Sequence, residues 1–213
     1  MTTILAYLSQ IPGIIIAIVL HEYIKALVST KLGDPIPRQQ GRLTLNPMKH
    51  VDFLGALCML VWGYGWSNPV QTSPIYYKDK RNGTLITYLV PILFNLLLGT
   101  SLAIVFKILN NSYIEYSFGY ASSASAALTA FEFLLDCLKY TAVFNISFAL
   151  FSIVPVYPLD GYKIMSTYMS ATSIIKMQQY EQILRIVLLF AIIFGGAGFI
   201  FDPLVGAIFG IVQ

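Results

Sequence analysis

Long apolar stretches alternate with shorter polar segments along the chain and predict its main helices. An apolar helix of about 20 residues is long enough to cross a bilayer. We expect four membrane spans, at about 4–31, 85–109, 126–156 and 186–200. A further apolar stretch at 53–66 is only fourteen residues long and contains three glycines. We expect this segment to enter the membrane and turn back instead of crossing it.

The polar segment at 33–50 separates the first span from this short apolar stretch. Three prolines and Gly41 interrupt it, and residues 42–46 alternate between apolar and polar types. Alternation between breaking residues is typical of a short strand. The pattern therefore predicts a β-hairpin-like loop at about 38–46.

Composition places the chain in the membrane. Of its 213 residues, 57% are hydrophobic and 11% are charged, and the mean hydropathy is +0.72. These values predict an all-α integral membrane protein, a multi-span helical bundle in which residues 1–213 form a single transmembrane domain with the lipid bilayer as its surroundings. A net charge of +3 gives no reason to expect a nucleic-acid partner.

The positions of the positive residues predict the topology, because lysines and arginines concentrate on the cytoplasmic side of a membrane. Seven of them flank the 53–66 segment: Lys31, Arg38, Arg42, Lys49, Lys78, Lys80 and Arg81. The 110–125 loop contains none. If 53–66 re-enters, all seven face the cytoplasm and the N-terminus and 110–125 lie outside. We therefore expect a multi-pass protein of the plasma membrane with this orientation.

The first predicted span contains three ionisable residues, His21, Glu22 and Lys25, in an otherwise apolar run. His21 and Lys25 are four residues apart and share one face of a helix. The order is one substitution short of His-Glu-x-x-His, in which two imidazoles bind zinc and the glutamate acts as general base. Ionisable groups inside a membrane segment are costly and indicate a functional site.

Four motifs in this order resemble the site-2 protease family of intramembrane zinc metalloproteases. They are His21-Glu22-x-x-Lys25, Gly41-Arg42-Leu-Thr-Leu-Asn46-Pro47-x-x-His50-x-Asp52, Pro91-x-x-x-Asn95 and Pro155-x-x-Pro158-Leu-Asp160-Gly161. The chain departs from the family pattern at Lys25, where the family has the second histidine, and at Ser152, where it has an asparagine.

The resemblance implies a membrane metalloendopeptidase that cleaves transmembrane segments of other membrane proteins. It implies that His21, Asp160 and the position of Lys25 supply the zinc ligands and that Glu22 activates the water molecule. It also implies that Asn95 binds the substrate peptide. In the expected topology, His21 and Asp160 both lie near the cytoplasmic ends of inward-running spans, so the site lies near the cytoplasmic side.

Lys25 changes the expected chemistry. A lysine binds a metal only as the neutral amine, and its ordinary pKa is about 10.4. We predict that its ammonium forms a buried ion pair with a carboxylate in place of zinc, which leaves a pseudoprotease able to bind transmembrane peptides. Two alternatives remain open at this point. One is an active zinc endopeptidase with an atypical ligand set, and the other is a small transporter or proton relay that uses Glu22, Lys25 and Asp160.

Each candidate residue also has a simpler structural interpretation. Lys25 can extend to the cytoplasmic interface, and Asp160 can cap the helix that follows it. Asn95 can form a hydrogen bond to a neighbouring helix. His50 lies in a loop, where a structural role is the more usual one.

Overall fold

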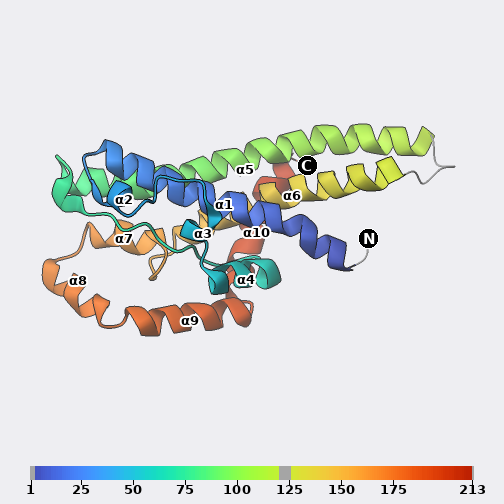
Figure 1. Cartoon of the computed structure of the whole chain (residues 1–213). Helices are drawn as coiled ribbons and strands as arrows, with labels where there is room; N and C mark the ends of the chain where they lie inside the picture. The colour runs from blue at the N-terminus through green and yellow to red at the C-terminus, as the bar shows by residue number, and fades with distance from the viewer. Residues whose placement is uncertain (1–2, 120–125, 213) are drawn as a thin grey trace.

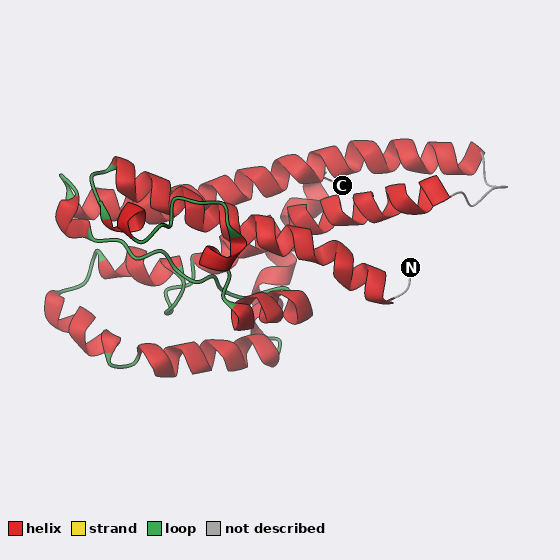
Figure 2. Ribbon diagram, in the orientation of Figure 1, coloured by secondary structure: helices red, strands yellow, loops and turns green. Residues whose placement is uncertain are grey.

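Helices and loops make up the computed structural model, which describes residues 3–119 and 126–212, with side chains for 4–113 and 128–210 (Figures 1 and 2). The elements are α1 (Thr3–Lys31), α2 (Ile36–Gln39), α3 (Pro47–His50), α4 (Phe53–Trp62), the 3₁₀ turn η1 (Pro74–Tyr76), α5 (Lys80–Gly119), α6 (Ala126–Ser152), α7 (Asp160–Ser166), α8 (Ala171–Gln178), α9 (Glu181–Ile193) and α10 (Gly196–Val212). Within the described part of the chain, α1, α5 and α6 are long and apolar enough to cross a membrane. The predicted all-α, multi-span fold is confirmed.

Helices α1, α5 and α6 pack against one another, and glycines bring their backbones close together. A Cβ atom at Gly13 of α1 would lie 2.9 Å from the backbone of Thr141 in α6. A Cβ atom at Gly99 of α5 would lie 2.8 Å from the carbonyl oxygen of Ala142. Close approach at small residues is the usual way in which membrane helices gain packing contacts.

The direction of these helices determines where their polar residues meet. Gly13 of α1 lies beside Thr141 of α6, and further along both helices the ring of His21 lies 5.0 Å from that of Phe148. Residue numbers rise together along this contact, so α1 and α6 run in the same direction. The later part of α1 and the chain that follows α6 therefore lie at the same end of the bundle.

The prediction of a fourth span at 186–200 is wrong in its boundaries. Two helices, α9 and α10, meet in this region at an angle of 64°, and α10 continues past residue 200 to Val212. Gly195 lies between them with φ of 77°, a conformation that favours glycine and ends helices. Together the two helices are long and apolar enough to form one broken span.

The prediction of a hairpin-like loop at 38–46 is also wrong, because no strand forms in these residues. Residues 36–39 form the short helix α2, Gly41 adopts a positive φ of 64°, and the chain then bends toward α3. The two terminal nitrogens of the Arg42 guanidinium, Nη1 and Nη2, donate to the carbonyl oxygens of Lys49 and Asn68, which holds the bend against a distant loop. A sequence alternation of five residues did not reveal these contacts.

The short apolar segment at 53–66 forms α4 followed by a loop. A ten-residue helix is about 15 Å long, roughly half the thickness of a bilayer core, so α4 is too short to cross alone. Its re-entry into the membrane remains a prediction. Gly55 and Gly65 let the loop pack directly on α4, since a Cβ at Gly55 would lie 2.0 Å from the carbonyl oxygen of Trp66.

Helix α6 ends at Ser152, before Pro155 and Pro158, as the two prolines predict. The chain then turns and starts α7 at Asp160. Gly161 packs so tightly on this turn that a Cβ atom would lie 1.9 Å from the carbonyl oxygen of Ile153. The position of Asp160 therefore depends on a glycine that follows it.

We expect Gly161→Ala to lower the free energy of unfolding by about 1–3 kcal/mol, because the added methyl group overlaps backbone atoms that cannot move independently. Unfolding in detergent by titration with dodecyl sulfate measures the change. Gly206→Ala is the matched control, since a Cβ at Gly206 meets no atom within 4 Å. Equal effects of the two substitutions would contradict the tight packing at Gly161.

Candidate functional site

A buried lysine lies at the centre of the site. Lys25 is 1% exposed, and its Nζ atom lies 2.7 Å from Glu22 Oε1 and 2.6 Å from Asp160 Oδ1. The ammonium also lies 5.5 Å from the centre of the Tyr88 ring on α5. The interpretation that Lys25 extends to the interface is therefore wrong, because one ammonium here neutralises two buried carboxylates.

Asp160 reaches this point from α7. Asp160 is the first residue of this helix. Leu159 occupies the N-cap position, and no side chain forms a capping hydrogen bond. The carboxylate instead contacts Lys25 through Oδ1 and His21 Nε2 through Oδ2, the latter at 2.7 Å. The capping interpretation of Asp160 is not supported, and the predicted meeting of residues 135 or more positions apart is observed.

Glu22 is held by three donors. Oε1 accepts hydrogen bonds from Lys25 Nζ and from Ser67 Oγ at 2.6 Å, and Oε2 accepts one from the backbone N–H of Val70 at 2.7 Å. Ser67 and Val70 belong to the loop after α4. The carboxylate is thus fixed in place by a segment 45 residues away in sequence.

His21 contacts one carboxylate and an aromatic ring. Its Nε2 atom shares a hydrogen with Asp160 Oδ2, which cannot donate when ionised, so the proton belongs to the imidazole. The Nδ1 atom is buried without a hydrogen-bond partner among the described residues, and the edge of the ring packs against Phe148. With this tautomer, the lone pair of Nε2 is not available to a metal.

The charges around Asp160 keep it ionised. Burial alone would raise the pKa of its carboxyl group, but the Lys25 ammonium and His21 outweigh burial and hold this pKa below its ordinary value. His50 lies apart from these charges. Burial lowers the pKa of its imidazole, and Nε2 lies 2.7 Å from the carbonyl oxygen of Thr44. His50 therefore serves the local loop structure. It forms no hydrogen bond or ion pair with the Lys25 cluster, which consists of Lys25, Glu22, Asp160 and His21.

Three buried side chains of the site could offer ligand atoms to zinc. Ligand atoms of His21, Glu22 and Asp160 all lie within 4.8 Å of one another, a spacing that suits a metal. The donors are nevertheless occupied, because Lys25 bonds both carboxylates and His21 donates to Asp160. A zinc-bound histidine almost always donates its other N–H to an acceptor, and His21 Nδ1 has none among the described residues. With Lys25 protonated, this donor set does not fit zinc.

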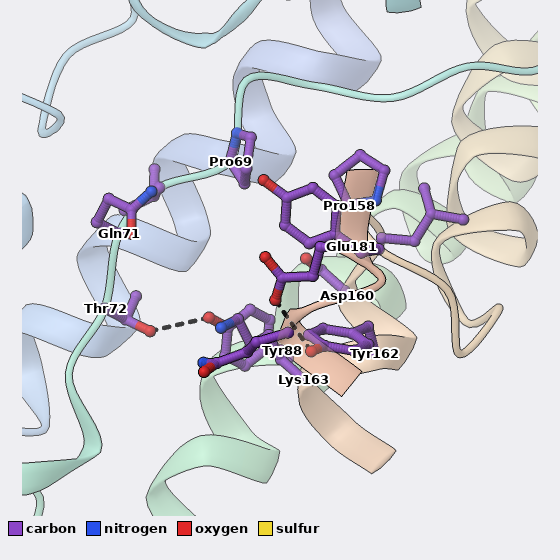
Figure 3. A pocket seen from close by; sticks show the side chains of 13 residues that line it. Pro69, Gln71, Thr72, Tyr88, Pro158, Asp160, Tyr162, Lys163 and Glu181 are labelled. Carbon is purple, nitrogen blue, oxygen red and sulfur yellow. Dashed lines mark hydrogen bonds between the residues drawn. The ribbon is translucent and has the colours of Figure 1, made fainter. Parts of the chain in front are cut away.

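A polar cavity of about 230 Å³ reaches Asp160 (Figure 3). One wall is the extended chain at 69–72, and the other walls come from α5, the turn at 157–159, α7, the end of α8 and the start of α9. The hydroxyl groups of Tyr88 and Thr72, which both line the cavity, form a hydrogen bond of 2.9 Å. The Tyr162 hydroxyl donates to Glu181 Oε1 at 2.9 Å. Burial, then the contact with Glu181, raises the pKa of Tyr162 to about 12, so its hydroxyl remains a donor.

The structure brings together four of the five residues singled out from the sequence: His21, Glu22, Lys25 and Asp160. Asn95 lies outside the cluster, and its Nδ2 donates to the carbonyl oxygen of Ala17 at 3.0 Å, as expected for a bond between helices. A role for Asn95 in substrate binding remains a prediction.

Sequence reasoning missed four residues that complete the site: Ser67, Val70, Thr72 and Tyr88. For Tyr88 a signal existed, because it precedes Asn95 by seven residues and so shares its face of α5. No pattern in the loop indicated that Ser67 and Val70 bond to Glu22.

Comparison with known proteins identifies the family. No protein-family model matches the chain, and no solved structure matches it. The chain is 30% identical over 208 residues to a Bacillus subtilis (strain 168) protein named "Putative zinc metalloprotease YwhC". This alignment covers 94% of the chain and 89% of the relative. At this identity and coverage, the chain belongs to the same protein family as YwhC.

Proposed function

We propose that this chain is a membrane protein of the site-2 protease type in which the Lys25 ammonium takes the place of the catalytic zinc. The observation that carries the proposal is the position of Lys25 Nζ, within 2.7 Å of carboxylate oxygens from Glu22 and Asp160. The name of the relative supports a zinc-dependent ancestry for the site. The protein binds transmembrane peptides and does not hydrolyse them, so it acts as a pseudoenzyme.

Electrostatics favour the ammonium over the metal. A bound zinc ion would polarise the scissile carbonyl group and make a hydroxide available at neutral pH. The Lys25 ammonium repels a dication and already neutralises the carboxylates that would attract one. Glu22 accepts three hydrogen bonds, so it is also poorly placed to take a proton from water.

The loop beside the cavity offers a place for a peptide. Arg42 donates to the carbonyl oxygen of Asn68 at one end, and the carboxylate of Asp34 accepts from the backbone N–H of Ser73 at the other. Between these anchors, the backbone groups of Gln71 and Thr72 have no hydrogen-bond partner among the described residues. An extended peptide can pair with such an edge.

We also propose a location and an orientation for the protein. Residues 1–213 form one transmembrane domain in the plasma membrane, and the Lys25 cluster lies near its cytoplasmic side. The positive residues around 53–66 support this orientation. The partners are a membrane-protein segment and the bilayer, and Asn95 contacts the bound peptide.

An active zinc endopeptidase is the second candidate. The observation in its favour is the close grouping of His21, Glu22 and Asp160, whose ligand atoms lie within 4.8 Å of one another. In that case Lys25 loses its proton and binds the metal as an amine, which burial can permit. Metal content separates the two candidates.

We expect the purified wild-type protein to contain far less than one zinc per chain after equilibration with the metal, because the ammonium occupies the site. Lys25→His should raise the content to about one per chain, and adding His21→Ala should remove it again. Plasma emission spectroscopy measures the metal. A wild-type protein with about one zinc, lost in His21→Ala, would show that the active-enzyme candidate is correct.

We expect Lys25→Met, measured in the presence of a chelator, to lower the free energy of unfolding by about 3–5 kcal/mol. The substitution leaves two buried carboxylates without a counter-ion. Lys163→Met is the control, because Lys163 is exposed at the rim of the cavity and forms no ion pair in the described part of the chain. Similar stabilities for the two variants would mean that Lys25 does not hold the cluster together.

A photo-reactive residue at Gln71 should cross-link to a synthetic transmembrane peptide in vesicles, and excess unlabelled peptide should compete the cross-link away. The free backbone edge beside Gln71 is the reason. The same probe at Ile108, which is exposed on α5 and does not line the cavity, is the control. Equal cross-linking at both positions would argue against a peptide site in this cavity.

A further inference from the structure

A second cavity, of about 380 Å³, lies apart from the Lys25 cluster. Helix α6, helix α10 and the turn after α4 form its walls. Its polar groups are Tyr64, Lys139, Ser147 and Asp202, and the remaining lining is apolar or glycine. The proposed function uses none of these residues.

The cavity contains an ammonium and a carboxylate that do not pair with each other. Lys139 and Asp202 both line it, yet their charged atoms are more than 4.0 Å apart. Within the described ranges, Lys139 forms no ion pair and no side-chain hydrogen bond. Space therefore remains between a positive and a negative group.

One oxygen of Asp202 is available to a ligand. Oδ1 accepts a hydrogen bond from the Tyr64 hydroxyl at 2.7 Å, which orients the carboxylate. Oδ2 accepts none in the described part of the chain and lies over Gly198, where a Cβ atom would come within 2.9 Å of it. Glycine at position 198 keeps this second oxygen uncovered.

The surroundings of the cavity are apolar. Helix α6 is long and apolar enough to span a membrane, and α10 is the second half of the broken span. The outer face of α10 exposes Phe199, Ile200 and Leu204. Charged groups in such segments are costly unless a partner neutralises them. A lipid-soluble ligand with a negative group for Lys139 and a positive group for Asp202 would neutralise both residues.

We propose that this cavity binds the headgroup of a phosphatidylethanolamine molecule, with Lys139 at the phosphate and Asp202 at the primary ammonium. A primary ammonium has N–H donors for the free Oδ2 atom, whereas the quaternary ammonium of phosphatidylcholine has none. An anionic lipid such as phosphatidylglycerol satisfies Lys139 but places a hydroxyl group, not a cation, near Asp202. The acyl chains lie against the apolar outer face of α10.

The site is also connected to the loop that holds Glu22. Tyr64, which bonds Asp202, precedes Ser67 by three residues, and Ser67 donates to Glu22. The lipid site and the Lys25 cluster are thus contacted by neighbouring residues of one loop. The lipid proposal does not depend on whether the cluster binds zinc or a peptide.

Native mass spectrometry of the full chain in detergent tests the proposal, with phosphatidylethanolamine, phosphatidylcholine and phosphatidylglycerol of identical acyl chains added in turn. We expect saturable binding of about one phosphatidylethanolamine, with affinity about tenfold above that of the other two lipids. Lys139→Met and Asp202→Asn should each reduce this affinity about tenfold, because each removes a charged contact.

A pair of glycine variants provides the steric control. Gly206 lines the cavity and Gly210 does not, and a Cβ atom meets nothing within 4 Å at either position. Gly206→Leu should therefore abolish the preference for phosphatidylethanolamine, and Gly210→Leu should leave it unchanged. Equal affinities for the three lipids, or an unchanged preference in Gly206→Leu, would overturn the proposal. Displacement of the lipid by an equal concentration of free phosphoethanolamine would show that a soluble ligand is bound instead.

Discussion

The structure depends on the ammonium of Lys25, which lies between two carboxylates with almost no exposure to solvent. Burying any one of these charges alone would be costly, and their mutual contacts offset that cost only while all three are in place. The ammonium therefore links α1 to α7, two elements that are far apart in the sequence. Its contacts also determine the protonation of the neighbouring imidazole, because an ionised Asp160 can only accept a hydrogen from His21.

Packing of the backbone brings these charges to one place. Helices α1 and α6 approach closely at Gly13 and run in the same direction, so the turn after α6 returns Asp160 to the level of Lys25. Gly161 then lets α7 start against that turn. The polar cluster is thus a consequence of close helix contacts made by residues without side chains.

The loop after α4 connects the separate parts of the molecule. Gly65 packs on α4, and Ser67 and Val70 hold Glu22. The start of the loop, at 63–64, lines the second cavity, and residues 69–72 line the first. Arg42 and Asp34 anchor it from the segment that precedes α3. In the polar segment at 33–50 the backbone bonds locally, in short helices and turns, and its side chains bond to the loop, so no hairpin forms there.

Hydropathy alone determined the class of the protein, because a helix that crosses lipid must be long and apolar, and α1, α5 and α6 show both features in the sequence. The spacing of His21, Glu22 and Lys25 likewise placed three ionisable groups on one helix. Tertiary structure decided the rest. Only packing shows that Asp160 shares the ammonium, that Ser67 and Val70 hold Glu22, and that Asn95 bonds to α1. These contacts join residues many positions apart, and a local pattern carries no record of the helix directions and backbone distances that bring them together.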